Sequence, residues 1–252
     1  MKFNTLFVGN VVHHFTEVPS TNALALEKVA KTTPSEGTVI SADYQTAGRG
    51  QIGSSWYASP GKNLLLSVIF RPRWLAARQQ FSLSQAVALA VADTISHFAS
   101  AKAFVKWPND VYLADKKLAG ILIQNSLSGL LLQSSVVGIG LNINEMDFPK
   151  VLPRPGSLQQ HLGKEVARKE VQHLLFQRLE ARYFQLKSNP AIIRADYLRN
   201  LYRYQEWHSF QEVDSGKIFT GQIIGVQETG KLAIQMPETH VQYFDLKEVA
   251  FL

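Results

Sequence analysis

The residues best suited to chemistry lie in the segment YQTAGRGQIGSSW (44–56), where Gly48, Gly50 and Gly53 match the pattern G-x-G-x-x-G. In a dinucleotide-binding fold this pattern follows a strand and opens a helix, whose amides hold a pyrophosphate. Here the glycines lead into the apolar run 63–70, which is typical of a buried strand. The residues between Asp43 and Asp93 also include no Asp or Glu to bind a ribose hydroxyl. The spacing is therefore a coincidence, and the sequence predicts a glycine-rich loop between two strands.

A loop of this composition has the chemistry to bind an anion. Glycines let backbone amides approach negatively charged oxygens closely. Arg49, placed between two glycines, adds a planar guanidinium group that matches a carboxylate or a phosphate. Taken alone, this composition is equally typical of an ordinary flexible loop, so both interpretations stay open until the companion segments are considered.

Two further segments combine strand-like runs with polar side chains. KWPNDVYLADKKLAGILIQ (106–124) places Lys106, Asp110 and Lys117 around a turn and the strand that follows it. VVGIGLNIN (136–144) is an apolar strand that contains two glycines and ends in asparagines. Individually, the first is better explained as a turn with surface lysines and the second as a core strand with bulge glycines. A functional interpretation requires that these segments meet in space.

The elements that must position these residues follow from the hydrophobic pattern. Strands are predicted at 38–45 and 63–70, on either side of the glycine loop, and after the first strand-like segment a short helix is predicted at 23–31, with Ser20, Thr21 or Asn22 as its cap. Longer helices are predicted at 81–99 and at about 164–187. Three strand-like segments, 103–107, 120–126 and 130–144, predict hairpins with turns near Pro108-Asn109 and Ser128-Gly129.

From about residue 205 the chain changes to short β-like runs punctuated by glycines. This pattern predicts a small antiparallel barrel of about 45 residues. We therefore expect two domains, 1–204 and 205–252.

Composition narrows the class of protein. The 252 residues are 46% hydrophobic and 18% charged, as in ordinary globular proteins, and they include no cysteine, which excludes disulfides, thiolate metal sites and cysteine nucleophiles. No signal-peptide core and no membrane-length apolar stretch occurs, so a soluble cytoplasmic protein is expected. The net charge is +6, but Lys and Arg are scattered, which favours a basic surface suited to anionic ligands over a DNA-binding face.

Taken together, these segments resemble the biotin protein ligase family. The resemblance runs in order through EVPSTN (17–22), DYQTAGRGQ…W (43–56), KWPNDVYL…KKLAGIL (106–122), GIGLNIN (138–144) and the small C-terminal β domain. It implies an α+β fold: a mixed β-sheet flanked by helices, of the class II synthetase-like biotin/lipoate ligase type, followed by a small SH3-like barrel. The family's optional N-terminal winged-helix domain is expected to be absent because the STN motif already falls at residue 20, so no DNA partner is expected.

The resemblance also implies a reaction and its participants. Biotin and ATP would form biotinyl-5′-AMP and pyrophosphate, and a lysine of a biotin carboxyl carrier protein of a carboxylase would then displace AMP. Mg²⁺ is expected on the ATP phosphates, with no metal site made by the protein alone. No membrane partner is expected, and both a monomer and a homodimer are compatible with the family.

The family pattern assigns roles to fourteen residues of this sequence. Arg49, Lys117 and Asp110 are the implied catalytic residues. The implied biotin-binding residues are Ser20, Thr21, Asn22, Gln45, Arg49, Gly50, Gln51, Trp56, Lys117 and Gly120. The implied residues for ATP and the adenylate are Gly48, Arg49, Gly50, Gln51, Trp56, Asn109, Lys117 and Asn142.

The sequence departs from the family pattern at Gln51, where members often carry a second arginine. Glutamine donates a hydrogen bond but brings no charge, so either the grip on the phosphates is looser or another basic residue, such as Lys62 or Arg71, compensates. Two other functions stay open: a lipoate or octanoate ligase of the same superfamily, and a non-catalytic basic binding module.

Overall fold

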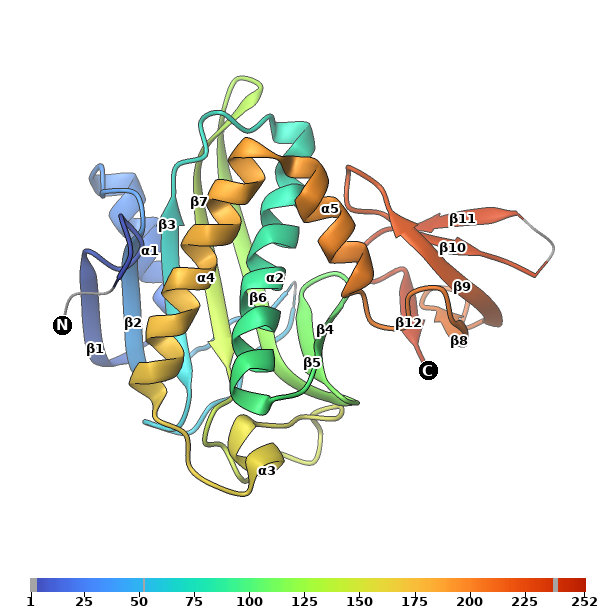
Figure 1. Ribbon diagram of the computed structural model, residues 1–252, viewed down its shortest axis with the longest axis horizontal. Coiled ribbons are helices and arrows are strands. Elements are labelled where there is room, and N and C mark those ends of the chain that lie inside the picture. The colour runs from blue at the N-terminus through green and yellow to red at the C-terminus, as the bar shows by residue number, and fades with distance from the viewer. Residues whose placement is uncertain (1–3, 52, 238–239) are drawn as a thin grey trace.

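The computed structural model describes residues 4–51, 53–237 and 240–252, and its strands form two separate sheets (Figure 1). The larger sheet has the order β1-β2-β3-β7-β6-β5-β4, and the smaller has the order β11-β10-β9-β8-β12. Helices flank the larger sheet, so the predicted α+β class with a small C-terminal β unit is confirmed.

The larger sheet contains β1 (Val12–Val18), β2 (Thr38–Gln45), β3 (Leu64–Phe70), β4 (Ala103–Lys106), β5 (Asp110–Leu113), β6 (Lys116–Ser128) and β7 (Leu131–Leu141). The helices are α1 (Thr21–Lys31), α2 (Gln80–Ala99), which the short 3₁₀ helix η1 (Ala77–Gln79) precedes, α3 (Leu158–Leu162), α4 (Arg168–Ser188) and α5 (Pro190–Arg199). The smaller sheet contains β8 (Trp207–Glu212), β9 (Ile218–Val226), β10 (Leu232–Gln235), β11 (Val241–Phe244) and β12 (Val249–Phe251).

Strand pairing follows the connections. β1 and β2 are parallel because α1 joins them as a crossover, and the remaining neighbours in both sheets are antiparallel. The predicted hairpins are confirmed: β4 turns into β5 around Pro108-Asn109, and β6 turns into β7 just after Ser128. The antiparallel β6–β7 pair is long and occupies the middle of the sheet.

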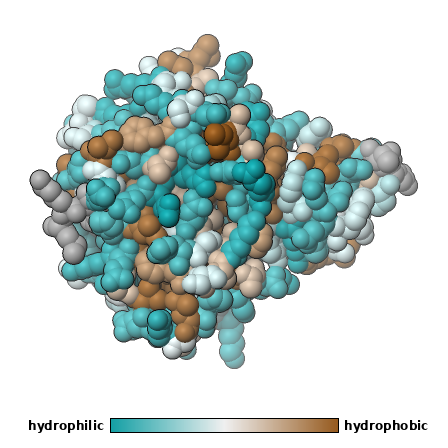
Figure 2. Space-filling view, in the orientation of Figure 1, coloured by the Kyte–Doolittle hydropathy of each residue, from teal (hydrophilic) through white to brown (hydrophobic). Residues whose placement is uncertain are grey.

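Helices cover both faces of the larger sheet. α2 and α4 lie over one face, and α1 packs on the other face against β2, β3 and β7 (Figure 1). All seven residues of β3 are buried in consequence. Its alternate residues Leu66 and Val68 belong to the main core, whereas Ile69 packs under α1 with Ile40 and Ala25. Figure 2 shows that the face over α2 and α4 is mostly hydrophilic, with its hydrophobic residues in small scattered groups.

Helix starts and core faces follow the sequence signals closely. Ser20 caps α1, with its Oγ accepting from the Ala23 amide at 3.5 Å. In α4 the predicted stripe of Val171, Leu175, Leu179 and Tyr183 is buried, although the helix begins at Arg168 rather than near 164. The short elements β5, α3 and α5 were not predicted.

The smaller sheet starts at Trp207, close to the predicted domain boundary at 204/205, which stays a prediction. It contacts the larger unit at the turn between β9 and β10, where the Trp107 Nε1 group donates to the Gly230 carbonyl at 2.8 Å. Every helix within the part of the chain that the structure describes is too short or too polar to span a bilayer.

Candidate active site

A cavity of about 360 Å³ lies where α1 begins, where the glycine loop returns to the sheet, and where β12 approaches from the smaller sheet. Of the fourteen residues predicted for the site, all but Gly48 and Asn142 line this cavity. The twelve are Ser20, Thr21, Asn22, Gln45, Arg49, Gly50, Gln51, Trp56, Asn109, Asp110, Lys117 and Gly120.

One end of the cavity is a connected set of amides and hydroxyls at the start of α1. The backbone amide and the hydroxyl of Thr21 both donate to the Gln45 Oε1 atom, at 2.8 and 3.1 Å. The Ser67 hydroxyl donates to the Asn22 Oδ1 atom at 2.6 Å, and the Asn22 Nδ2 group lies 3.2 Å from the Gln124 Oε1 atom. Because the carbonyl ends are held in this way, the amide orientations of Gln45 and Asn22 are fixed. This end suits a small neutral polar group.

The middle of the cavity is a glycine floor under the indole of Trp56. Gly120 and Gly140 are register partners on β6 and β7. A Cβ on Gly140 would lie 2.3 Å from the Trp56 Cε2 atom, and one on Gly120 would lie 2.7 Å from the Cζ3 atom. Gly120 is one of the implied biotin-binding residues, and the space beside it is filled here by the indole of Trp56.

The glycine loop folds back on itself before it reaches this floor. The Trp56 amide donates to the Gly48 carbonyl at 3.0 Å, and the Gly50 amide donates to the Ser54 carbonyl at 2.8 Å. Gly48 therefore lies behind Trp56 and supports the loop without lining the cavity.

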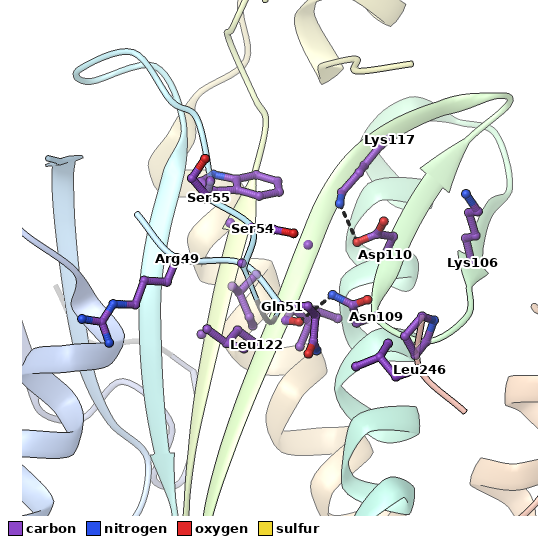
Figure 3. Close-up of a pocket in the computed structure, with 18 of the residues that line it drawn as sticks. Arg49, Gln51, Ser54, Ser55, Lys106, Asn109, Asp110, Lys117, Leu122 and Leu246 are labelled. Carbon is purple, nitrogen blue, oxygen red and sulfur yellow. Dashed lines mark hydrogen bonds and ion pairs between the residues drawn. The ribbon is translucent and has the colours of Figure 1, made fainter. Parts of the chain in front are cut away.

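An ion pair stands at the other end of the cavity. The Lys117 Nζ atom on β6 lies 2.7 Å from the Asp110 Oδ1 atom at the start of β5, and the two side chains point toward one another (Figure 3). Both side chains are partly exposed, at 29% and 20%. The Lys117 ammonium also lies 5.7 Å from the centre of a Trp56 ring, within the range of a cation–π contact. Lys117 is thus positioned to meet an anion that enters over Trp56.

Lys106 adds a second cation beside this pair. Its Nζ atom lies 5.0 Å from the Tyr112 ring centre and 4.9 Å from the Phe251 ring centre. Burial lowers the pKa of Lys106 below its ordinary value, and the nearby Asp110 carboxylate offsets part of this effect. Burial likewise raises the pKa of Tyr112 to about 12, so its phenol remains a neutral hydrogen-bonding group.

Two predicted residues lie differently from the expectation. Arg49 is exposed, and its guanidinium points away from Lys117 and Asp110 (Figure 3). Asn142 is buried outside the cavity lining, and its Nδ2 group donates to the Gly156 carbonyl at 3.0 Å. Lys62 and Arg71, which the sequence suggested as substitutes for a charge at position 51, do not line the cavity either.

The cavity also has a wall that sequence reasoning missed. It is formed by β12 and by the turn that precedes β12, through Leu246, Lys247, Val249, Ala250 and Phe251. No spacing signal could have found them, because they lie more than a hundred residues from the other lining segments and reach the site only through tertiary packing. Among the described residues, no group of three or more His, Asp or Glu side chains is arranged to hold a metal ion.

Three features define a class of ligase-like proteins. They are a mixed sheet with helices on both faces, a polar slot at a helix start, and a lysine–aspartate pair at the opposite end of the cavity. The model of the Biotin/lipoate A/B protein ligase family matches residues 14–142, just over half of the chain. The chain therefore belongs to the biotin/lipoate A/B protein ligase family.

Individual relatives agree with this family. The chain is 32% identical over 170 residues to the bifunctional ligase/repressor BirA of Bacillus subtilis, covering 66% of this chain and 51% of that protein. It is 34% identical over 182 residues to a biotin–[acetyl-CoA-carboxylase] ligase of Mycobacterium tuberculosis, covering 71% and 66%. The chain thus spans about half the length of the first of these curated relatives.

Among solved structures, the fold resembles the biotin protein ligase of Aquifex aeolicus in complex with biotin and ATP. The TM-score is 0.78 at 25% identity, and the match covers 96% of this chain and 98% of that one.

Proposed function

We propose that this protein is an ATP-dependent biotin–protein ligase, which activates biotin as biotinyl-5′-AMP and transfers it to a lysine of a biotin carboxyl carrier protein. The observation that carries the proposal is one cavity with a fixed polar slot at one end and the Lys117–Asp110 pair, 2.7 Å apart, at the other. Family membership and the activities for which the relatives are named support the same activity.

In the first step a biotin carboxylate oxygen attacks the α-phosphorus of ATP, and the bond to the β-phosphate breaks to release pyrophosphate. Biotin's ureido ring is neutral and needs a few fixed hydrogen bonds in an otherwise apolar slot, which Thr21, Asn22 and Gln45 supply. The ammonium of Lys117 then meets both the carboxylate and the α-phosphate, stabilising the charge that builds up between them.

In the second step the amine of the acceptor lysine attacks the acyl carbon, the carbon–oxygen bond to phosphate breaks, and AMP leaves. Asp110 orients the incoming amine and accepts the proton that it loses. Asp110 is the one carboxylate among the described lining residues, so Mg²⁺ would be held mainly by the ATP phosphates. We propose that the protein acts in the cytoplasm, without a nucleic acid or membrane partner, as a monomer or as a homodimer.

The activity is tested by ATP–pyrophosphate exchange with biotin, lipoate and octanoate compared side by side. We expect pyrophosphate exchange with biotin and no exchange with lipoate or octanoate. Exchange with lipoate or octanoate, but not with biotin, would make the protein a lipoate-type ligase. No exchange with any acid would favour a non-catalytic binding module, which in turn predicts a salt-sensitive affinity for nucleic acid. Mass spectrometry of a carrier domain, with its acceptor lysine replaced by arginine as the control, then tests the transfer step.

A further inference from the structure

The glycine loop brings little positive charge to the inner part of the cavity. Arg49 is the one basic side chain between residues 44 and 56, and its guanidinium points away from the Lys117–Asp110 pair (Figure 3). It forms no hydrogen bond or ion pair with another residue that the structure describes. Gln51, which does line the cavity, is neutral. A triphosphate held against this loop therefore needs a cation from elsewhere.

The smaller sheet supplies a cation to the cavity lining. Lys247 lies in the turn between β11 and β12 and lines the same cavity as Gln51. Its Nζ atom lies 3.9 Å from the position that a Cβ on Gly53 would occupy, at the tip of the glycine loop. Two segments that are almost two hundred residues apart in sequence thus meet beside the cavity, and the smaller sheet places its charge there.

The backbone at Lys247 is unusual in a way that agrees with a functional role. Its φ angle is +68°, in the left-handed region that residues other than glycine and asparagine rarely adopt. Such conformations cost free energy and cluster at binding sites, where the surrounding structure holds them. The neighbouring Leu246 lines the cavity too, so the turn as a whole is directed toward the site.

We propose that Lys247 binds the phosphates of ATP against the glycine loop and supplies the charge that Gln51 lacks. The inference rests on the proposed function and adds to it a nucleotide-binding residue from the C-terminal sheet. Lys117 remains the cation at the reacting carboxylate and α-phosphate, whereas Lys247 meets the nucleotide at the outer edge of the loop.

The test measures the KM values for ATP and for biotin in biotin-dependent pyrophosphate exchange. Lys247→Ala is expected to raise the KM for ATP about 10- to 100-fold, as for the loss of one charged hydrogen bond, while the KM for biotin changes less than about 2-fold. Lys247→Arg is expected to keep the KM for ATP within about 3-fold of wild type. Lys217→Ala, in the turn between β8 and β9 and exposed outside the cavity, removes the same charge and is expected to change neither KM.

A second variant makes the assignment specific. Adding Gln51→Arg to Lys247→Ala restores a charge on the loop itself and is expected to recover most of the lost affinity for ATP. Three results would each overturn the inference and leave the ligase assignment standing. They are an unchanged KM for ATP in Lys247→Ala, an equal effect of Lys217→Ala, and no recovery of ATP affinity in the double variant. Absence of biotin-dependent exchange in the wild-type protein would instead overturn the proposed function.

Discussion

The Lys117 side chain is held at three points, by its place on β6, by Asp110 and by the face of Trp56. Its ammonium is therefore oriented before an anion arrives, which is the condition under which one charge contributes most to a transition state. Lys116 is adjacent in the sequence, but it is exposed and lies outside the cavity lining. Comparing substitutions of the two lysines therefore separates the effect of where a charge lies from the effect of removing one charge.

Replacement of Lys117 by alanine is expected to reduce biotin-dependent pyrophosphate exchange by about 100-fold or more, because a charged group aimed at the reacting oxygens is lost. The far-UV circular dichroism spectrum should be unchanged, since the side chain is partly exposed. Lys116→Ala is the matched control and should retain normal exchange. Near-normal exchange in Lys117→Ala would remove this residue from the mechanism.

Lys106 predicts a pH dependence of stability. Its pKa in the folded protein lies below 10.5 because burial disfavours the charged form. Between the folded and unfolded pKa values the unfolded chain binds more protons, so the free energy of unfolding rises with pH in that window. Below that window, where the folded and the unfolded chain both hold the proton, the full cost of burying the charge is present.

The variant Lys106→Met is therefore expected to have a higher free energy of unfolding than wild type at pH 7, with the difference shrinking as the pH rises toward 10.5. Urea unfolding at pH 7 and at pH 9.5 measures this difference. Lys150→Met, at an exposed position, provides the control. A Lys106→Met difference that stays constant over this pH range would contradict the assignment.

Residue types near the site were predictable, but side-chain directions were not. The motifs indicated twelve residues that line one cavity, because amides, glycines and charges in that order carry a chemical pattern. Asn142 turned out to bond the Gly156 carbonyl, and Arg49 points away from the ion pair (Figure 3). Both orientations depend on loop packing that a linear pattern does not encode.

Among the elements, β6 and β7 matter most, because their backbones support Trp56 directly. Substitution of Gly140 by alanine would place a methyl group 2.3 Å from an indole carbon, so the ring must move. We expect biotin to bind about 10-fold more weakly or worse, with a loss of stability of about 1–3 kcal/mol from overpacking. Calorimetric titration with biotin and thermal unfolding measure the two effects.

Gly225→Ala is the matched control for this substitution. Gly225 lies in β9, and a Cβ there would meet no atom within 4 Å, so biotin binding should be normal. Wild-type affinity for biotin in a folded Gly140→Ala protein would show that the position of the indole does not matter for the ligand.

Elements with long periodic patterns were predicted well, and short ones were not. β2 was predicted at its observed bounds, and the stripe on α4 was predicted residue by residue. β5 has four residues and α3 has five, too few for periodicity to be visible. The order of strands, with β7 inserted between β3 and β6, depends on contacts between distant segments.

In the molecule as a whole, the two sheets must keep a fixed relation because both contribute walls to one cavity. Gly230 lies at their junction, where its carbonyl accepts from Trp107 and its φ angle is +99°. A Cβ at this position would lie 2.9 Å from a ring carbon of Phe81. The junction thus has little room to adjust.

Gly230→Ala is expected to lower the free energy of unfolding by about 1–3 kcal/mol, because both the backbone conformation and the contact become unfavourable. It should also reduce pyrophosphate exchange, because Phe251 and Lys247 would shift relative to Lys106 and the glycine loop. Denaturant unfolding and exchange kinetics provide the two measurements, with Gly225→Ala again as the control. Full exchange activity in a destabilised Gly230→Ala protein would show that the two sheets act independently.

The contribution of the smaller sheet to the site was the part least accessible from sequence. Its glycine-punctuated runs indicated a separate small β unit, but nothing in them indicated which turn would face the larger sheet. That relation is set by packing such as the Trp107–Gly230 contact, whose two residues are widely separated in the chain.

The glycine floor also constrains how the site could be redesigned. Since β6 and β7 present bare main chain at Gly120 and Gly140, any substitution there adds volume and none removes it. Side chains at these positions can therefore only narrow the range of acids that fit. A site for a bulkier acid must be opened from another wall, and Leu66 and Leu122 are lining residues that can be shortened. The main-chain floor thus sets an upper limit on cavity depth, which makes selectivity here easier to tighten than to broaden.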